Sequence, residues 1–186
     1  MKIIGVVPVK ANSNRFPNKN ISLLQGKPLF YHAIEPLIKS DYISEVFVPT
    51  NSPIVKDYIE KKGENKIKVI HRGKNISADE DPLLKVLKFT HYSIDSDYDA
   101  MAVIMANCPG HEVDYVNKAI KLFQETKSKE FRSFNKFGLE NGFFIFSKEI
   151  IENSNSISSY LCSLTNNGEE IHFRHELDKL NNQKEE

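Results

Sequence analysis

Apolar and polar residues follow one another in blocks along this chain, and the blocks predict strands separated by helices. Five short apolar runs, rich in β-branched or aromatic residues, are typical of strands. They cover residues 3–9, 43–48, 67–70, 100–106 and 142–146. The first run is of the kind that is buried on both faces of a parallel sheet. Between the runs, apolar residues recur at helical spacing and predict four helices, which begin near Leu29, Pro53, Pro82 and Val113.

The second of these helices has the clearest predicted boundaries. Ser52 fits an N-cap, and Pro53 fits the first helical position, where a missing N–H costs nothing. Gly63 fits the left-handed residue that often ends a helix. We therefore expect this helix to begin at Pro53 and to stop at Gly63.

The last part of the chain has a weaker pattern. Residues 153–167 are rich in Ser and Asn, and we predict no helix or strand there. The pattern predicts a short strand over residues 171–174 and a terminal helix over residues 176–184. The regular alternation of strand and helix predicts an α/β fold, a three-layer sandwich with a mostly parallel sheet. We expect one domain over residues 1–178, followed by a tail over residues 179–186.

Composition removes several classes of function. Lys plus Arg and Asp plus Glu number 25 each among the 186 residues, and zero net charge argues against a nucleic-acid binder. No run approaches the ~20 apolar residues of a membrane span. The first apolar run is also too short, and too soon followed by Lys10, for a secretory signal. With only Cys108 and Cys162, we expect a cytoplasmic protein with reduced thiols and with neither a nucleic-acid nor a membrane partner.

The polar loop after the first strand is the strongest candidate for chemistry. Ligands of open α/β sheets bind at the carboxyl ends of strands, where this loop starts. Lys10, Arg15 and Lys19 could surround a polyphosphate, with hydrogen bonds from Asn12 and Ser13. The alternative is a solvated loop with scattered cations. The loop matches neither the Walker motif nor the dinucleotide fingerprint, so the spacing alone leaves both interpretations open.

The neighbours of these cations carry a resemblance to a known family. The run PVKANSNRFPNKN, followed by LLQGKPL, resembles the signature loop of the acylneuraminate cytidylyltransferases. It is also similar to that of the related enzyme that activates the octulosonic acid of lipopolysaccharide. Lys10 stands where the family has Arg. The matching residues are Ser13, Arg15, Pro17, Lys19 and Asn20.

Later segments resemble the family in order and spacing, so that the resemblance covers residues 1–178. Arg72 and Asp79 occupy matching places within HRGKNISAD. The other similar segments are VFVPTNS at residues 46–52, VIMANCP at 103–109, the Asn-Gly strand at 141–146 and IHFRHELD at 171–178.

The resemblance implies a nucleotide-diphospho-sugar transferase-like (Rossmann-like) fold and a nucleotidyl transfer. CMP would pass from CTP, or from another nucleoside triphosphate, to an acidic sugar related to sialic acid or octulosonic acid, for lipopolysaccharide or capsule biosynthesis. A Mg²⁺ ion and a homodimer are implied as well. The catalytic residues would be Lys10, Arg15 and Lys19. The nucleotide-binding residues would be Asn12, Ser13, Asn20, Arg72 and Asp79.

The chain departs from the family pattern in its late motif. The family has two metal-binding carboxylates there, one residue apart, which would share one face of a strand. His172 and Arg174 occupy these places, and a guanidinium cannot ligate Mg²⁺. The sequence therefore names no metal ligand, and an ordinary surface strand remains the alternative for this segment.

Other departures concern the first loop, the base and the middle of the chain. Asn12 and Asn14 replace a Gly and a Lys, and Met105 replaces the Gln that reads cytosine in the family. The segment between residues 109 and 141 is short, and we expect one helix and little else in it. These departures favour an alternative function: an impaired member that binds nucleotide, sugar or a partner without turnover.

Several other groups are weaker candidates. Cys108 with His111 could form a nucleophile and base, but no orienting group is evident. His172 and His175 could bind a transition metal or simply lie on the surface. The acidic run at 79–81 fits the N-terminus of a helix. A cluster of Phe residues between 131 and 146 is expected in the core or at a subunit interface. A sugar-nucleotide glycosyltransferase is a third, more distant function.

Overall fold

The computed structural model describes residues 1–11, 13, 15–73, 76, 82–153, 161–168 and 170–183. Two residues of the predicted nucleotide site, Asn12 and Asp79, lie outside this part of the chain, as does the rest of the acidic run at 79–81.

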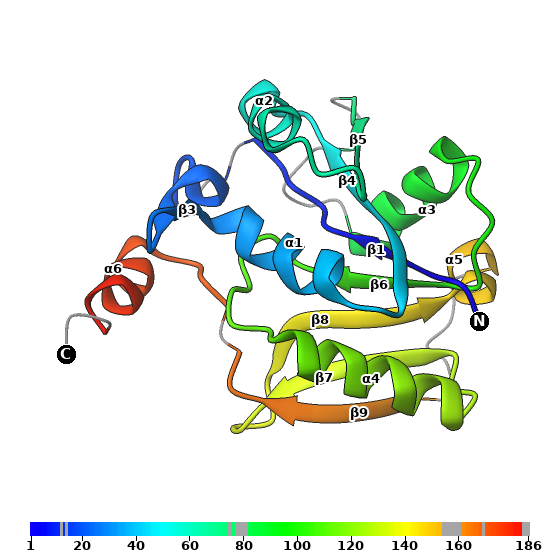
Figure 1. The fold of residues 1–186 in the computed structure, drawn as a ribbon. Coiled ribbons are helices and arrows are strands. Elements are labelled where there is room, and N and C mark those ends of the chain that lie inside the picture. Colours follow the sequence, from blue (N-terminus) through cyan, green and yellow to red (C-terminus); the bar gives the residue numbers. More distant parts are fainter. Residues whose placement is uncertain are drawn as a thin grey trace.

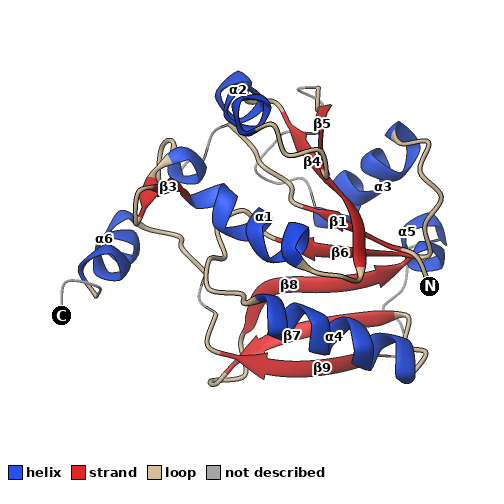
Figure 2. Ribbon diagram, viewed as in Figure 1, coloured by secondary structure: helices blue, strands red, loops and turns tan. Residues whose placement is uncertain are grey.

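A seven-stranded sheet forms the centre of the described structure (Figures 1 and 2). Its order is β5-β4-β1-β6-β8-β7-β9, and every neighbouring pair is parallel except the two pairs that contain β8. This confirms the predicted α/β fold with a mostly parallel sheet. The strands are β1 Ile3–Val6, β4 Ile43–Thr50, β5 Ile67–His71, β6 Ala100–Ile104, β7 Glu130–Asn135, β8 Glu140–Ser147 and β9 Leu161–Asn166.

Helices cover both faces of the sheet and make three layers (Figure 1). One core cluster contains residues of α1, α2 and α4 on one face, and a second contains residues of α3 and α5 on the other. The helices are α1 Leu29–Lys39, α2 Pro53–Lys62, α3 Leu83–Ser93, α4 Val113–Glu125, α5 Lys148–Asn153 and α6 Arg174–Asn182. None of the helices in the described part of the chain combines the length and the apolarity that crossing a membrane requires.

The predicted boundaries of α2 are confirmed. The Ser52 hydroxyl accepts a hydrogen bond from the Val55 N–H at 3.4 Å, Pro53 is the first helical residue, and Gly63 caps the end with φ of 63°. A residue with a side chain rarely adopts that left-handed conformation, which is why Gly fits there.

Two strands were missing from the sequence prediction, which was therefore wrong about the segment between residues 109 and 141. β7 lies in this segment, and β9 lies in the Ser- and Asn-rich region. In β7, Phe131 and Ser133 are buried while Arg132 between them is partly exposed. A two-residue alternation with charged members gives a weaker signal than the continuous apolar runs of the central strands.

The predicted strand over residues 171–174 was also wrong. Arg174 is the first residue of α6, and His172 and Phe173 lie in the preceding turn. The Glu176 carboxylate accepts hydrogen bonds from the N–H groups of these two residues at 2.6 and 2.8 Å. A carboxylate that satisfies N–H groups at a helix start stabilises the helix against a strand. The predicted terminal helix is confirmed in α6, which also contains the proposed domain end at residue 178.

A second small sheet and one short helix precede α1. The 3-10 helix η1 Lys19–Ile21 leads into the strands β2 Leu23–Leu24 and β3 Lys27–Pro28. The helix α6 lies beside this hairpin (Figure 1), because Asn181 accepts from the Gln25 N–H at 2.8 Å and donates to the Leu23 carbonyl at 3.2 Å. The C-terminal helix is thereby attached to the N-terminal part of the chain.

His111 is a neutral buried histidine that ties the turn before α4 to the sheet. Its Nε2 lies 3.0 Å from the Asn141 carbonyl, and its Nδ1 lies 2.9 Å from the Asn166 side-chain nitrogen. Burial lowers the pKa of His111 to about 4. The amide nitrogen is a donor, so Nδ1 accepts and Nε2 carries the proton. Protonation of Nδ1 would set two donors against each other.

We predict that His111 makes the fold acid-sensitive. Its pKa is about 4 in the folded state against 6.5 for an ordinary histidine, so the unfolded chain binds the proton more readily as the pH falls from 6.5 to 4. Stability is therefore lost over this window, by about 3 kcal/mol at most for this one group. Urea unfolding at pH 7 and pH 4.5 measures the loss.

His111→Gln is the matched variant for this measurement. It should be less stable than the unmodified chain at pH 7 but should lose less stability on acidification. An equal loss in both proteins would contradict the assignment.

Candidate functional site

The carboxyl ends of β1, β4, β5 and β6 meet at one edge of the sheet, and the chain after β1 crosses this edge. The Val9 N–H donates to the Pro49 carbonyl at 3.1 Å, which continues the pairing of β1 with β4. The Ala11 N–H then donates to the Asn51 side chain at 2.8 Å. These bonds fix the start of the polar loop at the place where ligands of open α/β sheets bind.

A cavity of about 160 Å³ opens at this edge. Four of the predicted site residues line it, from two segments of the chain that are about fifty residues apart. Residues that follow β6, among them Met105 and Asn107, line the cavity as well. The predicted residues are Lys10, Lys19, Asn20 and Arg72, and the remaining lining is Pro8, Leu83, Val86 and Ala106.

Lys19 is held by a backbone carbonyl from late in the chain. Its Nζ donates a hydrogen bond to the Ile171 carbonyl at 2.9 Å. Burial lowers the pKa of Lys19, and the nearby charges of Lys10 and Arg15 lower it further, whereas Cys108 and Glu170 raise it. The ammonium is thus partly shielded from water and lies near other positive charges. A bound anion would be stabilised there.

Lys10, Asn20 and Arg72 are positioned by different means. The Asn20 side chain donates to the Lys10 carbonyl at 3.0 Å and so fixes the backbone that carries Lys10. Arg72 directly follows β5, and its N–H donates to the Thr50 carbonyl at 2.8 Å. Only 4% of Arg72 is exposed, which is unusual for a residue with a guanidinium. Its positive charge therefore lies within the edge of the sheet.

Two predicted residues of the loop do not line the cavity. Arg15 is exposed, and Ser13 is half-buried. Arg15 still acts on the cavity through its charge, which lowers the pKa of Lys19. The roles assigned to Arg15 and Ser13 stay predictions.

The late segment joins the site through Ile171. The Ile171 N–H donates to the Asn107 carbonyl at 2.8 Å, and the Asn107 side chain donates back to the Ile171 carbonyl at 3.1 Å. On either side of Ile171, the Glu170 carboxylate and the His172 imidazole lie 2.8 Å apart. The sequence prediction did not name Glu170, which lies directly before the segment 171–178 that it singled out.

The residues that the structure describes at this edge do not fit a magnesium ion held by the protein. Arg174 pairs with Asp178 at 3.2 Å and lies over the Phe16 ring, and His172 pairs with Glu170. Among the described residues, no group of three or more His, Cys, Asp or Glu side chains could hold a metal ion. A hard cation prefers several oxygen ligands, whereas the described carboxylates of this segment, Glu170, Glu176 and Asp178, each already have a partner within the chain.

Cys108 is a structural thiol rather than a nucleophile. It is fully buried, and burial together with Glu170 raises its pKa well above the ordinary value. A thiol that stays protonated neither attacks nor binds metal readily. The neutral, buried His111 interacts with Asn141 and Asn166, so the two residues do not form a nucleophile and base.

The Phe cluster forms the core for the most part. Phe131, Phe143, Phe144 and Phe146 are buried, as expected, while Phe137 is 75% exposed in the turn between β7 and β8.

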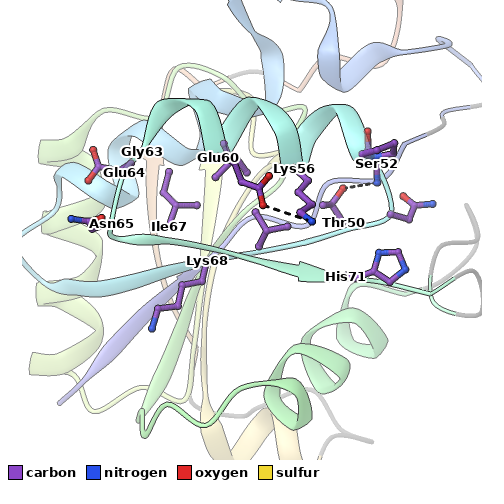
Figure 3. Close-up of a pocket in the computed structure, with 14 residues that line it drawn as sticks. Thr50, Ser52, Lys56, Glu60, Gly63, Glu64, Asn65, Ile67, Lys68 and His71 are labelled. Carbon is purple, nitrogen blue, oxygen red and sulfur yellow. Dashed lines mark hydrogen bonds and ion pairs between the residues drawn. The ribbon is translucent and has the colours of Figure 1, made fainter.

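A larger hollow of about 860 Å³ lies between α2 and the edge strand β5 (Figure 3). Lys56 and Glu60 form an ion pair of 3.7 Å on the α2 side, and Lys68 extends away from α2 and pairs with Glu45. None of the predicted site residues within the described ranges lines this hollow. The smaller cavity, with its gathered cations, is therefore the candidate site.

Solved structures with similar folds cover almost the whole chain. A CMP:2-keto-3-deoxy-manno-octonic acid synthetase complexed with CTP has a TM-score of 0.77 at 13% identity, with 98% of each chain covered. A cytidylyltransferase from Leptospira borgpetersenii has a TM-score of 0.64 at 17% identity, with 94% of this chain and 80% of that one covered. At these identities the likeness shows the fold alone, and it agrees with the predicted nucleotide-diphospho-sugar transferase-like architecture.

Curated relatives are distant in sequence. The CMP-N,N'-diacetyllegionaminic acid synthase of Legionella pneumophila is 26% identical over 129 residues, which are 68% of this chain and 55% of the relative. The N-acylneuraminate cytidylyltransferase of Escherichia coli O18:K1:H7 is 28% identical over 123 residues, which are 66% of this chain and 28% of the relative. The chain thus spans about half of the first relative and less than a third of the second. A family model described as Cytidylyltransferase matches residues 4–130.

We predict that a polyphosphate binds at Lys19 with uptake of protons. The lowered pKa of Lys19 should rise when phosphate charge replaces part of its repulsion from Lys10 and Arg15. Between the free and the bound pKa the complex holds more protons, so affinity should fall as the pH rises through this window. Calorimetry with inorganic tripolyphosphate, in two buffers of different ionisation enthalpy, measures the uptake.

Lys19→Met and Lys121→Met are matched variants for this test. Lys121 lies on α4, where it pairs with Glu125. Lys19→Met should abolish the buffer-dependent heat and weaken binding at least tenfold, while Lys121→Met should change neither. Equal binding by the two variants would overturn the assignment of Lys19.

Proposed function

This chain belongs to the cytidylyltransferase family, and from that premise we propose that it transfers CMP from CTP to an acidic sugar. The sugar would be related to sialic acid or to octulosonic acid, and the product would serve surface polysaccharide biosynthesis in the cytoplasm. The observation that carries the proposal is the cavity at the carboxyl edge of the sheet, where Lys10, Lys19 and Arg72 gather. The names of the distant relatives, which include sialate, legionaminate and octulosonate cytidylyltransferases, support the substrate class.

The cations of the cavity would hold the triphosphate and balance its charge. The sugar hydroxyl attacks the α-phosphorus, and pyrophosphate leaves in line with the attack. Nucleotidyl transfer needs little covalent help, so positioning and electrostatic stabilisation account for most of the rate. Lys19 and Arg15 would interact with phosphate oxygens and Lys10 with the α-phosphate, while Ser13, Asn20 and Arg72 would contact the nucleotide. Asn12 and Asp79 keep the nucleotide-binding roles that the resemblance implies.

Magnesium, which the family implies, would reach this site with its nucleotide rather than through a set of protein carboxylates. No step is therefore assigned to a metal held by the chain. The positive side chains of the cavity would balance the negative charge of the phosphates whether or not a metal ion is bound.

An alternative function is binding of nucleotide, sugar or a partner without turnover. One observation favours it: the late segment has His172 and Arg174 where two carboxylates are expected, and both side chains have partners within the chain. A homodimer is part of the proposal by analogy with the family only.

We predict that the chain releases pyrophosphate from CTP when an acidic sugar is present. Each nucleoside triphosphate is supplied with Mg²⁺ and a panel of acidic sugars. Lys19→Ala should lower kcat/KM by about 10²–10³, which is the usual loss when one preorganised donor to the transition state is removed. Lys121→Ala serves as the control and should keep full activity.

The two functions give different results in this assay. Turnover that depends on Lys19 supports the enzyme. Nucleotide binding by calorimetry without pyrophosphate release from any sugar contradicts it and supports the binding protein.

Met105 gives a second prediction, which concerns the choice of base. Its thioether lines the cavity beside Leu83 and Val86, and it offers no hydrogen bond to a base edge. We expect the dissociation constants of CTP and UTP for the unmodified chain to differ by less than about tenfold. A base that meets a thioether, without a strong hydrogen-bond partner, is poorly distinguished from a similar base. Met105→Gln should raise the preference for CTP, measured as the ratio of the two dissociation constants. An unchanged ratio would mean that the base lies elsewhere.

A further inference from the structure

Glu170 links a buried thiol to a partly exposed imidazole in the turn before α6. Its Oε2 lies 2.8 Å from the His172 Nε2. Its Oε1 points to the other side, because a Cβ added to Gly142 would stand 3.1 Å from this oxygen and 2.1 Å from the Cys108 Sγ. The three side chains therefore lie in the order Cys108, Glu170, His172, from the core outward.

Contacts at Cys108 hold the inner end of this series of three side chains in place. The Cys108 thiol hydrogen-bonds to the Glu170 carboxylate, and because burial raises its pKa it remains a donor. Gly142 has φ of 75° and no side chain, which leaves room for the contact between the thiol and the carboxylate. Glu170 is thereby held in one orientation, with its second oxygen directed to His172.

The outer end is connected through the backbone of Ile171 to residues that line the cavity. Ile171, between Glu170 and His172, accepts hydrogen bonds through its carbonyl from Lys19 at 2.9 Å and Asn107 at 3.1 Å. Lys19 and Asn107 both line the cavity. The imidazole is thus one residue away from the backbone atom that the proposed phosphate-binding lysine contacts.

We propose that His172, oriented by Glu170, is the general base that accepts the proton of the attacking sugar hydroxyl. This rests on the proposed nucleotidyl transfer. The hydroxyl oxygen forms a bond to the α-phosphorus, and its proton passes to the His172 Nδ1. The bond between the α-phosphorus and the bridging oxygen breaks, and its electron pair leaves with pyrophosphate. His172 is the catalytic residue in this step, and Glu170 and Cys108 are positioning residues.

The Glu170 contact selects the tautomer that a base needs. A carboxylate accepts hydrogen bonds only, so the His172 Nε2 carries a proton toward it and the Nδ1 is left as the acceptor. The carboxylate also stabilises the imidazolium that forms when the proton is taken, as an acidic partner does for a catalytic histidine. A histidine with a carboxylate partner can accept a proton without any metal ligand in the late segment.

Other charges also act on His172. The Glu176 carboxylate accepts from the His172 N–H at 2.6 Å, and its pKa is lowered in part by the charges of His172 and His175. Lys19 interacts electrostatically with Glu170. Arg174 is turned to Asp178 and the Phe16 ring.

The test compares three variants across pH. His172→Gln should lower kcat for pyrophosphate release by about 10²–10⁴, the range for loss of a general base, and should remove the acidic limb of the kcat profile. Glu170→Gln should lower kcat less, because the His172 ring loses the carboxylate that orients it. Nucleotide affinity, measured by calorimetry, should stay within about threefold in both. His175→Gln, a neighbouring histidine that stacks on Phe173, should match the unmodified chain.

Each outcome of this comparison either supports or contradicts the proposal. If His172→Gln keeps kcat and the acidic limb while the unmodified chain turns over, the base is another group and the proposed function stands. If His172→Gln loses nucleotide affinity in step with kcat, His172 binds substrate rather than accepting a proton. If the unmodified chain releases no pyrophosphate, the base has no reaction and the inference falls with the proposed function. Loss of kcat with retained affinity and an altered pH profile supports the inference.

Discussion

The hydrogen bond from the Lys19 ammonium to the Ile171 carbonyl is the contact on which the arrangement of the site depends. It joins two parts of the chain that are 152 residues apart. On one side lies the loop after β1, and on the other lies the turn that precedes α6. An ammonium in a partly dry place needs an oxygen partner, and a backbone carbonyl provides one without adding a full negative charge. The lysine is thus fixed but keeps its net charge for an anion.

Apolar packing supports this bond. A separate small core, made of Phe16, Leu24, Leu29, Ile171 and Leu177, lies between the loop, the small hairpin and α6. It brings Arg174 over the Phe16 ring and α6 against the hairpin. The polar loop is therefore not an independent segment of the surface, since its aromatic residue is part of a core that the C-terminal helix completes. Loss of α6 would expose this core and release the partner of Lys19.

The antiparallel strand β8 explains why the site gathers residues from late in the sequence. Because β8 runs against its neighbours, its first residues, Asn141 and Gly142, lie at the carboxyl edge of the parallel strands. The Gly142 carbonyl accepts a hydrogen bond from the Met105 N–H at 2.8 Å there. Because Gly142 has no side chain, it leaves space for Cys108 and Glu170. A parallel strand in this position would present its amino end to the opposite edge. The reversal is what completes the edge at which Lys10, Lys19 and Arg72 meet.

The sequence alone determined the central strands, the helices α1, α2, α3 and α4 and the loop that carries the cations, because continuous apolar runs, helical periodicity and turn residues are local signals. The sequence did not predict α5, which also covers the sheet. It did not determine β7 and β9, whose polar outer faces weaken the two-residue pattern, nor the start of α6, which depends on the Glu176 carboxylate. Only the tertiary structure could show that Glu170 joins Cys108 to His172, and that Arg72 is drawn into the cavity while Arg15 stays outside. Apart from the pair of Glu170 and His172, these contacts join residues far apart in the chain, and no local pattern encodes the distance between them.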